Sequence, residues 1–344
     1  MTSNYQQAQQ SFDLQQAAQR FLSGSVDALN ACYECCDRHA LPGQIALFWQ
    51  GKDGRKEQYT FRELQQRASQ FANFLKSQGV SKGDRVSGLL PRTPELIITI
   101  LATWRIGAVY QPLFTAFGPK AIEHRLQLAQ SKLVVTDVCN RDKLNEVDGC
   151  PAIVTVTGAK GTGLYQGDYS FWAEVNRQSD QCELVMMNIQ DPFLLMFTSG
   201  TTGPAKPLQV PLKALIAFGA YMQDAIGLRA EDSFWNIADP GWAYGLYYGI
   251  TGPLLLGHPT IFYEGAFTAD SLCQIVQDYG VNNLAGAPTA YRMMMAADPK
   301  QMAKLHGKFR VVSSAGEPLN PEVFRWFKQV LDAPIFDHYG QTEV

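Results

Sequence analysis

The sequence lacks an apolar run long enough to cross a bilayer, which needs about 20 residues. Its longest such run, residues 96–104, is flanked by Glu95 and Arg105. No N-terminal signal is recognisable, because the start of the chain is polar and rich in glutamine. We therefore expect no membrane span and a cytoplasmic location.

A large net charge of either sign is also missing. The 344 residues carry a formal net charge of −3 at pH 7. So small a charge gives no bulk attraction to nucleic acid or to an anionic membrane, and any anion must be bound by local geometry. We expect no nucleic-acid partner. The apolar share of 46% and the charged share of 18% are typical of a globular protein of one large lobe or two domains.

The seven cysteines form no spaced framework of the kind that secreted proteins use. Cys32, Cys35, Cys36 and His39 are spaced so that a helix would place them on one face. Such side chains can bind zinc. The alternative is a helix face packed with small buried cysteines, and it is favoured because zinc ligands usually come from separate segments.

Strand-like and helical segments alternate along the chain. Thr60 and Glu63 form a capping box ahead of an apolar stripe that stops at Gly79. Thr93 and Pro94 mark a second helix start. The expected strands are 85–90, 108–112, 133–136, 193–197, 260–263, 282–285, 310–313 and 334–336, and the expected helices include 60–79, 93–106, 120–130 and 212–226. This alternation predicts a parallel α/β fold.

The expected domain organisation has three parts. Residues 1–30 form a leader, and residues 31–188 form a first α/β subdomain. Residues 189–344 form a second α/β subdomain. The segment 137–190 is the least regular, since glycine recurs through it.

The segment 197–206 (FTSGTTGPAK) is the most informative in the chain and follows a short apolar run. Glycines let backbone N–H groups approach an anion, and hydroxyls and an ammonium group donate to phosphate oxygens. The loop does not fit the Walker A pattern, because Lys206 does not follow a glycine. The alternative is a solvated turn.

Two later segments, 314–318 (SAGEP) and 337–343 (DHYGQTE), accompany this loop. Together the three resemble the signature of the adenylate-forming, or AMP-binding, superfamily. That superfamily includes acyl-CoA synthetases, aryl-CoA ligases, luciferases and peptide-synthetase adenylation domains. Its phosphate loop reads roughly T-S-G-[ST]-T-G-x-P-K-G and its later motif reads Y-G-x-T-E. The resemblance extends from about Asn30 to the last residue.

The loop departs from the family pattern in two places. The family's proline stands directly before its lysine, whereas here Ala205 separates Pro204 from Lys206. Pro207 also replaces a glycine of the family. These departures leave open how the loop closes over pyrophosphate.

The resemblance implies two adjacent αβαβα-type subdomains of the family's N-terminal domain. The chain ends one residue after Glu343, whereas family members continue into further parts. We therefore expect a truncated domain that lacks the β-barrel subdomain and the small C-terminal domain and is poorly active alone.

The resemblance also assigns roles to the nucleotide-binding residues. The loop would hold the β- and γ-phosphates of ATP through Thr198, Ser199, Gly200, Thr201, Thr202, Gly203 and Lys206. The adenine site would comprise Gly316, Glu317, Pro318, Asp337, His338, Tyr339, Gln341 and Thr342. Tyr339 would stack on the purine, unless it is only a packing residue. The catalytic residues would be Lys206, Thr342 and Glu343. Thr342 would donate to the α-phosphate, and Glu343 would hold Mg²⁺. Attack on the α-phosphorus builds negative charge, which such donors and a metal stabilise.

The segment 239–245 (DPGWAYG) resembles the part of acetyl-CoA and medium-chain acyl-CoA synthetases that lines the acyl site. The acyl pocket would be formed by Trp242, Ala243, Tyr244, Ala315 and Gly340. Acetyl-CoA synthetases have a tryptophan at the position of Gly340, so the glycine favours an acid longer than acetate. The alternative is that Tyr244 refills the space.

The implied activity is that of an ATP-dependent carboxylate–CoA ligase, in which an acyl-adenylate forms and CoA then displaces AMP. ATP, Mg²⁺ and CoA would be required, and the partners would be small molecules. Two alternatives remain open: an adenylating enzyme that loads an acyl-carrier protein, and a truncated, non-catalytic nucleotide-binding fragment.

Overall fold

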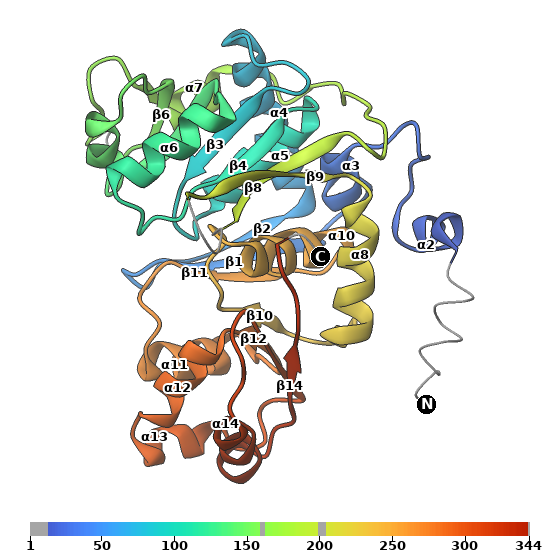
Figure 1. Ribbon diagram of the computed structural model, residues 1–344, viewed down its shortest axis with the longest axis vertical. Helices are drawn as coiled ribbons and strands as arrows, with labels where there is room; N and C mark the ends of the chain where they lie inside the picture. The colour runs from blue at the N-terminus through green and yellow to red at the C-terminus, as the bar shows by residue number, and fades with distance from the viewer. Residues whose placement is uncertain (1–12, 159–161, 199–203, 343–344) are drawn as a thin grey trace.

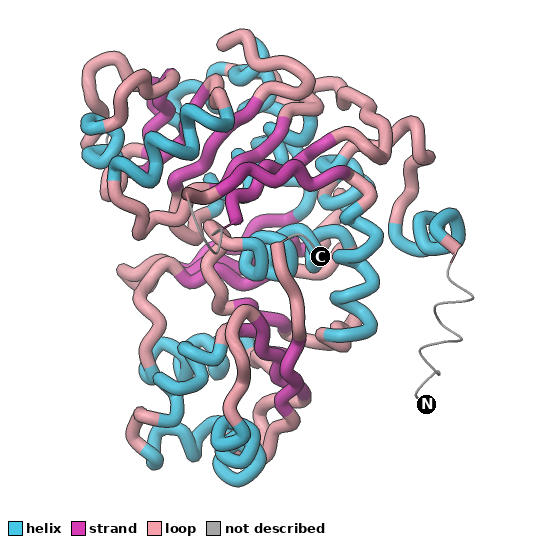
Figure 2. Tube along the Cα trace, viewed as in Figure 1, coloured by secondary structure: helices cyan, strands magenta, loops and turns pink. Residues whose placement is uncertain are grey.

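The computed structural model describes residues 13–158, 162–198 and 204–342. These residues form a mixed α/β fold with three sheets (Figure 1). The largest has seven strands in the order β7-β6-β5-β3-β4-β8-β9, the second has four in the order β10-β12-β13-β14, and the third has the order β11-β1-β2. Figure 2 shows the seven-stranded sheet in the upper part of the view and the four-stranded sheet in the lower part.

The seven-stranded sheet is parallel except at its last pair, β8 and β9. Its strands are β3 (Arg85–Leu89), β4 (Val109–Pro112), β5 (Leu133–Asp137), β6 (Ala152–Val156), β7 (Tyr169–Ser170), β8 (Pro192–Thr198) and β9 (Lys206–Pro211). The associated helices are α4 (Phe61–Ser77), α5 (Pro94–Arg105), α6 (Pro119–Ala129) and α7 (Phe171–Arg177). Buried Trp104 of α5 joins helix to sheet, because its indole N–H donates to the Phe193 carbonyl of β8 at 3.0 Å.

The four-stranded sheet is entirely parallel. Its strands are β10 (Phe234–Asn236), β12 (Asn283–Gly286), β13 (Val311–Ala315) and β14 (Ile335–His338). The helices that follow in this part of the chain are α11 (Ala269–Tyr279), α12 (Pro288–Met295), α13 (Pro299–Met302) and α14 (Pro321–Trp326). Tyr291 and Phe327 meet edge to face at 5.1 Å in a second apolar core.

The third sheet, which the sequence did not predict, joins distant parts of the chain. Its strand β1 (Ile45–Gln50) pairs antiparallel with β2 (Lys56–Thr60) and parallel with β11 (Thr260–Tyr263). Strands β8 and β9 likewise belong to the seven-stranded sheet although they follow residue 188. Hydrogen bonding between strands therefore does not follow the expected boundary at residue 188, and the division into subdomains stays a prediction.

The remaining helices lie outside the regular sheet connections. They are α2 (Leu14–Phe21), α3 (Ala31–Cys35), α8 (Ala214–Ala220), α9 (Ala243–Leu246) and α10 (Gly252–Leu255). The helix expected over residues 212–226 is present as α8, which continues as a π-helical turn over Tyr221–Ala225. None of the helices in the described ranges is both long enough and apolar enough to span a bilayer.

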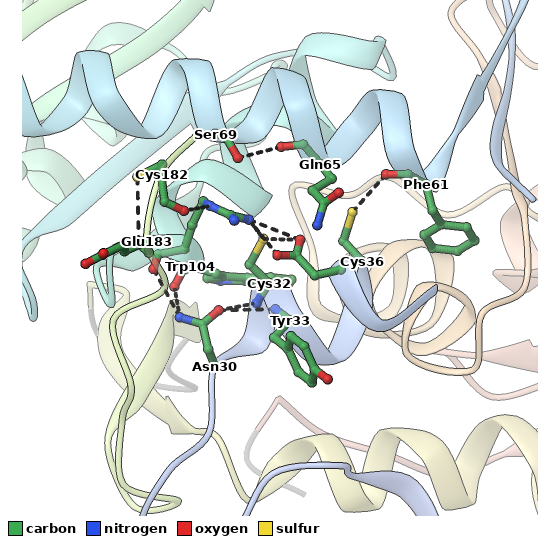
Figure 3. A network of polar contacts seen from close by, with 12 residues as sticks. Asn30, Cys32, Tyr33, Cys36, Phe61, Gln65, Ser69, Trp104, Cys182 and Glu183 are labelled. Atoms are coloured by element: carbon green, nitrogen blue, oxygen red, sulfur yellow. Dashed lines mark hydrogen bonds and ion pairs between the residues drawn. The ribbon is translucent and has the colours of Figure 1, made fainter. Parts of the chain in front are cut away.

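Cys32, Cys35 and Cys36 are buried and have separate partners, and Figure 3 shows Cys32 and Cys36 among them. The thiol of Cys36 donates to the Phe61 carbonyl at 3.4 Å, whereas that of Cys35 donates to the Thr251 carbonyl at 3.8 Å. Cys32 lies 3.7 Å from the carboxylate of Asp37. The expected single helix face is wrong, because α3 ends at Cys35 and His39 belongs to a following 3₁₀ turn. No trio of His, Cys, Asp or Glu side chains within the described ranges is placed to hold a metal ion.

Candidate active site

The carboxyl ends of the four parallel strands β10, β12, β13 and β14 lie at one edge of their sheet. In parallel α/β sheets, ligands bind in the crevice outside these ends. The segments that leave the strands there include residues 237–245, 286–292, 315–318 and 338–342, which contain most of the residues that the sequence singles out. The sheet thus brings together three motifs that are far apart in the chain.

Strands β13 and β14 set the relative position of the two predicted adenine segments. Their register pairs Ser314 with Asp337 and Ala315 with His338. Directly after β13, Gly316 has a φ of +96°, which strains any residue with a side chain. Asp337 is exposed, and one of its oxygens accepts a hydrogen bond from the Leu319 N–H at 3.4 Å.

The carboxylate of Glu317 is held by α12. It forms an ion pair with Arg292 at 2.6 Å and accepts the Thr289 hydroxyl at 2.7 Å. The Thr289 and Arg292 hydrogen bonds keep the pKa of the Glu317 carboxyl below its ordinary value. The turn after β13 is therefore anchored to a helix.

His338 contacts an aromatic cluster that includes Tyr221 of the π-helical turn. Its Nδ1 lies 2.6 Å from the Tyr221 hydroxyl, and the Tyr221 ring stacks on Tyr248 at 4.0 Å. Burial lowers the pKa of His338, against the smaller opposing influence of Asp337. Burial has the opposite effect on the Tyr248 hydroxyl and raises its pKa to about 12. The predicted adenine segment thus rests on neutral aromatic side chains, and no sequence motif pointed to Tyr221.

The predicted acyl-pocket residues divide into an exposed and an enclosed part. Trp242 is 41% exposed and contacts Phe114 and Phe117, both at 5.6 Å. Tyr244 lies deeper and contacts the ring of Tyr248 at 5.8 Å; burial raises the pKa of its hydroxyl.

The other three predicted acyl-pocket residues lie on or beside this edge. Ala315, at the end of β13, is buried, Ala243 opens α9, and Gly340 is exposed. Side chains from the ends of both large sheets therefore meet at this edge.

Arg92 fixes the contact between the two large sheets. It follows β3, and its guanidinium donates to the Ile237 carbonyl at 2.8 Å and lies 4.0 Å from the Asp239 carboxylate. Burial lowers the pKa of Arg92, while Asp239 raises it. Nothing in the sequence marked Arg92, because its partners lie about 145 residues away.

The predicted phosphate loop connects β8 and β9 at the same edge of the seven-stranded sheet as Phe114. Its ends are paired, since Thr198 faces Lys206 in the antiparallel register. The Nε2–H of His124 donates to the Ala205 carbonyl at 3.0 Å, just before the lysine. Lys206 and Pro204 are exposed, whereas Thr198 is half-buried. The predicted phosphate ligands Ser199, Gly200, Thr201, Thr202 and Gly203 lie outside the described residues.

The end of the later motif is open to solvent. Tyr339 is 84% exposed, and Gly340 and Gln341 are exposed beside it. The carbonyl of Thr342 accepts a hydrogen bond from the Tyr247 hydroxyl at 3.5 Å. The predicted magnesium ligand Glu343 lies outside the described residues. The stacking role expected of Tyr339 therefore requires a ligand, because no ring among the described residues covers it.

The fold and this edge define a ligand-binding α/β protein of the open-sheet type. More particularly, the chain belongs to the AMP-binding enzyme family, whose model matches residues 34–344.

Individual relatives agree with this assignment. The acetyl-coenzyme A synthetase of Bacillus subtilis (strain 168) is 36% identical over 348 residues, an alignment that covers 99% of this chain and 60% of the relative. The corresponding enzyme of Psychromonas ingrahamii is 34% identical, with 92% of this chain and 53% of the relative covered. A crystal structure of an acyl-CoA synthetase from Brucella canis superposes with a TM-score of 0.95 at 54% identity, covering 99% of this chain and 62% of that one. The chain thus spans less than two thirds of the length of each.

Proposed function

We propose that the protein is an ATP-dependent carboxylate–CoA ligase that acts through an acyl-adenylate. The observation that carries the proposal is the convergence of segments 239–245, 315–318 and 338–342 at one carboxyl edge of a parallel sheet. Membership of the AMP-binding enzyme family supports it. Acetyl-coenzyme A synthetases and an acyl-CoA synthetase are among the relatives, which favours CoA over a carrier protein as the acceptor.

In this proposal the nucleotide lies across the edge of the four-stranded sheet. The purine stacks on the exposed ring of Tyr339, and Asp337 accepts from its exocyclic amine. The loop that ends at Lys206 binds the β- and γ-phosphates through backbone N–H groups, hydroxyls and the ammonium group. Thr342 donates to the α-phosphate.

Magnesium would be bound by Glu343 together with the phosphates of ATP, as is usual for this ion. When bound, it would neutralise charge that develops on the α-phosphate as the carboxylate attacks. The residues of this chain then have three tasks: to orient the carboxylate, to donate to the phosphate oxygens and to exclude water.

The acid is proposed to be longer than acetate. Gly340 contributes no side chain to the pocket. Trp242, Phe114 and Phe117 offer an apolar surface at the same edge, which suits an alkyl or aryl chain. The ring of Tyr244 already contacts that of Tyr248. This contact supports a pocket in which Tyr244 does not fill the space that Gly340 leaves open.

The direct test is carboxylate-dependent pyrophosphate–ATP exchange. It would use acids from acetate to decanoate together with benzoate, and both this chain and the full reading frame of its gene. We expect exchange to be strongest with an acid longer than acetate and to be lost in the Lys206→Ala variant. Substitution of Lys213, a lysine outside the loop, by alanine is the matched control and should leave exchange unchanged.

The possible outcomes separate the alternatives. Exchange without transfer to CoA, but with transfer to a phosphopantetheinyl carrier protein, would replace the CoA ligase by a carrier-loading enzyme. ATP binding without exchange in either form would indicate a nucleotide-binding module. Preference for acetate would refute the argument from Gly340 while leaving the ligase assignment intact.

A further inference from the structure

A cavity of about 790 Å³ is lined by none of the predicted site residues. It is formed at the carboxyl ends of β5 and β6, where Asp137 and Val156 end their strands, and at the start of α5. In the strand order β4-β3-β5-β6-β7, β3 lies between β4 and β5. The chain therefore adds β4 on one side of β3 and then adds β5, β6 and β7 on the other side. Such a reversal is the place in an open α/β sheet where ligands bind. The topology alone therefore marks this cavity as a candidate binding site.

The cavity is strongly acidic. Five carboxylates line it, those of Asp53, Glu57, Glu95, Asp137 and Glu264, against only two basic side chains, Lys52 and Arg55. The guanidinium of Arg55 is already bound to Asp53 at 2.7 Å. Lys52 thus remains as the one cavity-lining cation without a described ion pair. A net negative cavity attracts cations and repels nucleotides and carboxylic acids.

Glu264 is the carboxylate best placed to bind a ligand. Its neighbours are engaged, because Glu95 accepts the indole N–H of Trp172 at 2.8 Å and Asp137 accepts the side-chain amide of Asn140 at 2.7 Å. No hydrogen bond or ion pair of the Glu264 carboxylate is present among the described residues. Burial raises its pKa, Lys52 opposes this effect, and Asp137 and Glu95 raise the pKa further. A bound cation would relieve this repulsion.

Thr93, a residue of the cavity wall, has a buried hydroxyl. Thr93 is 9% exposed and lines the cavity, yet its Oγ1 has no hydrogen-bond partner in the described part of the chain. It is the N-cap residue of α5, but its side chain does not cap the helix. A buried hydroxyl without a partner costs free energy, which a ligand can recover by hydrogen bonding to it.

The remaining wall is apolar and aromatic. Val138 is 36% exposed, and Val156, Trp49 and Trp172 lie around it. Guanidinium groups already lie over the rings of both tryptophans, that of Arg55 at 5.4 Å over Trp49 and that of Arg67 at 5.6 Å over Trp172. Aromatic surfaces beside carboxylates favour a cation that carries an apolar body over a hydrated metal ion.

We propose that this cavity binds an organic ammonium ion with an apolar body, its charge directed at Glu264 and its body against Trp172 and Val138. A bare metal ion does not suit the cavity, because no trio of acidic, histidine or cysteine side chains in the described ranges is arranged to hold one. The site is separate from the proposed ligase chemistry and does not depend on it.

The test uses three probes that share one body and differ in charge: phenethylammonium, 2-phenylethanol and phenylacetate. Binding to the full chain would be measured by isothermal titration calorimetry and by the fluorescence of the tryptophans. We expect phenethylammonium alone to bind at this site and to weaken as salt is added. The Glu264→Gln variant should bind it roughly tenfold more weakly, which corresponds to about 1.4 kcal/mol.

Two further variants test the assignment, one as a control outside the cavity and one within it. Asp278→Asn removes an acid that pairs with Lys56 outside the cavity and should bind the probe as the parent does. Thr93→Val keeps the shape of the residue but removes its hydroxyl, and should weaken binding. The proposal is overturned if the neutral or anionic probe displaces phenethylammonium at equal concentration, if no saturable binding occurs, or if a folded Glu264→Gln variant binds like the parent.

Discussion

At the scale of single residues, the buried ion pair between Asp37 and Arg105 deserves a test of its own. Their charged groups are 2.9 Å apart, and the side chains are 7% and 8% exposed. Cys32 lies against both, with its sulfur 3.6 Å from the guanidinium. Removing one partner of such a pair leaves an uncompensated charge in a medium of low polarity.

Asp37→Asn should therefore lower the free energy of unfolding by about 3 kcal/mol. The exposed pair of Asp224 with Arg20 is the control, because an ion pair in water contributes little. Urea unfolding of both variants checks this. An Asp37→Asn variant as stable as Asp224→Asn would show that Arg105 is stabilised mainly by its hydrogen bond to the Cys182 carbonyl at 2.8 Å.

His338 should titrate below its ordinary pKa of 6.5, because burial lowers the pKa of its ring. Just below pH 6.5, the His338 ring is therefore protonated more readily in the unfolded chain than in the folded protein. The contribution of His338 to stability is therefore present above pH 6.5 and is lost as the pH falls below that value. Ring resonances followed by NMR across this range provide the measurement, and a midpoint at or above 6.5 would contradict the expectation.

The limits of sequence analysis are clear at the residue scale. Motifs of fixed spacing identified the segments around Tyr339 and Lys206, and the burial of the three cysteines matched the packing alternative. Tyr221 and Arg92 could not be found in this way. Each acts through a partner more than 100 residues distant, and spacing along the chain carries no information on such contacts.

At the scale of elements, local capping chemistry was the most reliable signal. In α4 the Thr60 hydroxyl accepts the Glu63 N–H at 3.2 Å, and the Glu63 carboxylate accepts the Thr60 N–H at 2.8 Å. The predicted capping box is therefore confirmed. At the start of α5, Thr93 stands in the same position but makes no side-chain cap.

These two threonines give a matched pair of variants. Thr60→Ala should lower the free energy of unfolding by about 1 kcal/mol, because an N-cap hydrogen bond is lost. Thr93→Ala should leave it nearly unchanged, since no cap is broken. Chemical denaturation of both variants tests the contrast, and equal losses would mean that Thr93 caps α5 in solution.

Several elements were missed because their local signals are weak. Strand β1 is apolar without alternation, since neighbours cover both of its faces, and a short run of this kind does not distinguish strand from helix. Strand β7 has only two residues, and β6 lies in the glycine-rich segment that was expected to be irregular. Pairing with neighbours, rather than local propensity, makes these segments strands.

At the scale of the whole molecule, Arg92 is informative because its contacts join the two large sheets. Arg92→Met should lower the free energy of unfolding by about 2 kcal/mol, because the Ile237 carbonyl and the Asp239 carboxylate both lose a charged partner. Calorimetry should also show a broader transition as the sheets unfold less cooperatively. Arg177→Met, which removes an exposed pair with Glu174, is the control. A transition as sharp as that of the parent would mean that apolar contacts alone couple the sheets.

The single antiparallel strand of the large sheet has a consequence for how this protein can vary. Because β9 runs back along β8 with Lys206 opposite Thr198, the lysine is placed by the ladder and not by the residues of the loop. The displaced Pro204 and the unusual Pro207 can therefore be accommodated while the lysine keeps its place. Insertions or substitutions between β8 and β9 should alter how tightly a ligand is enclosed, whereas the pairing of β9 with β8 sets the position of the lysine.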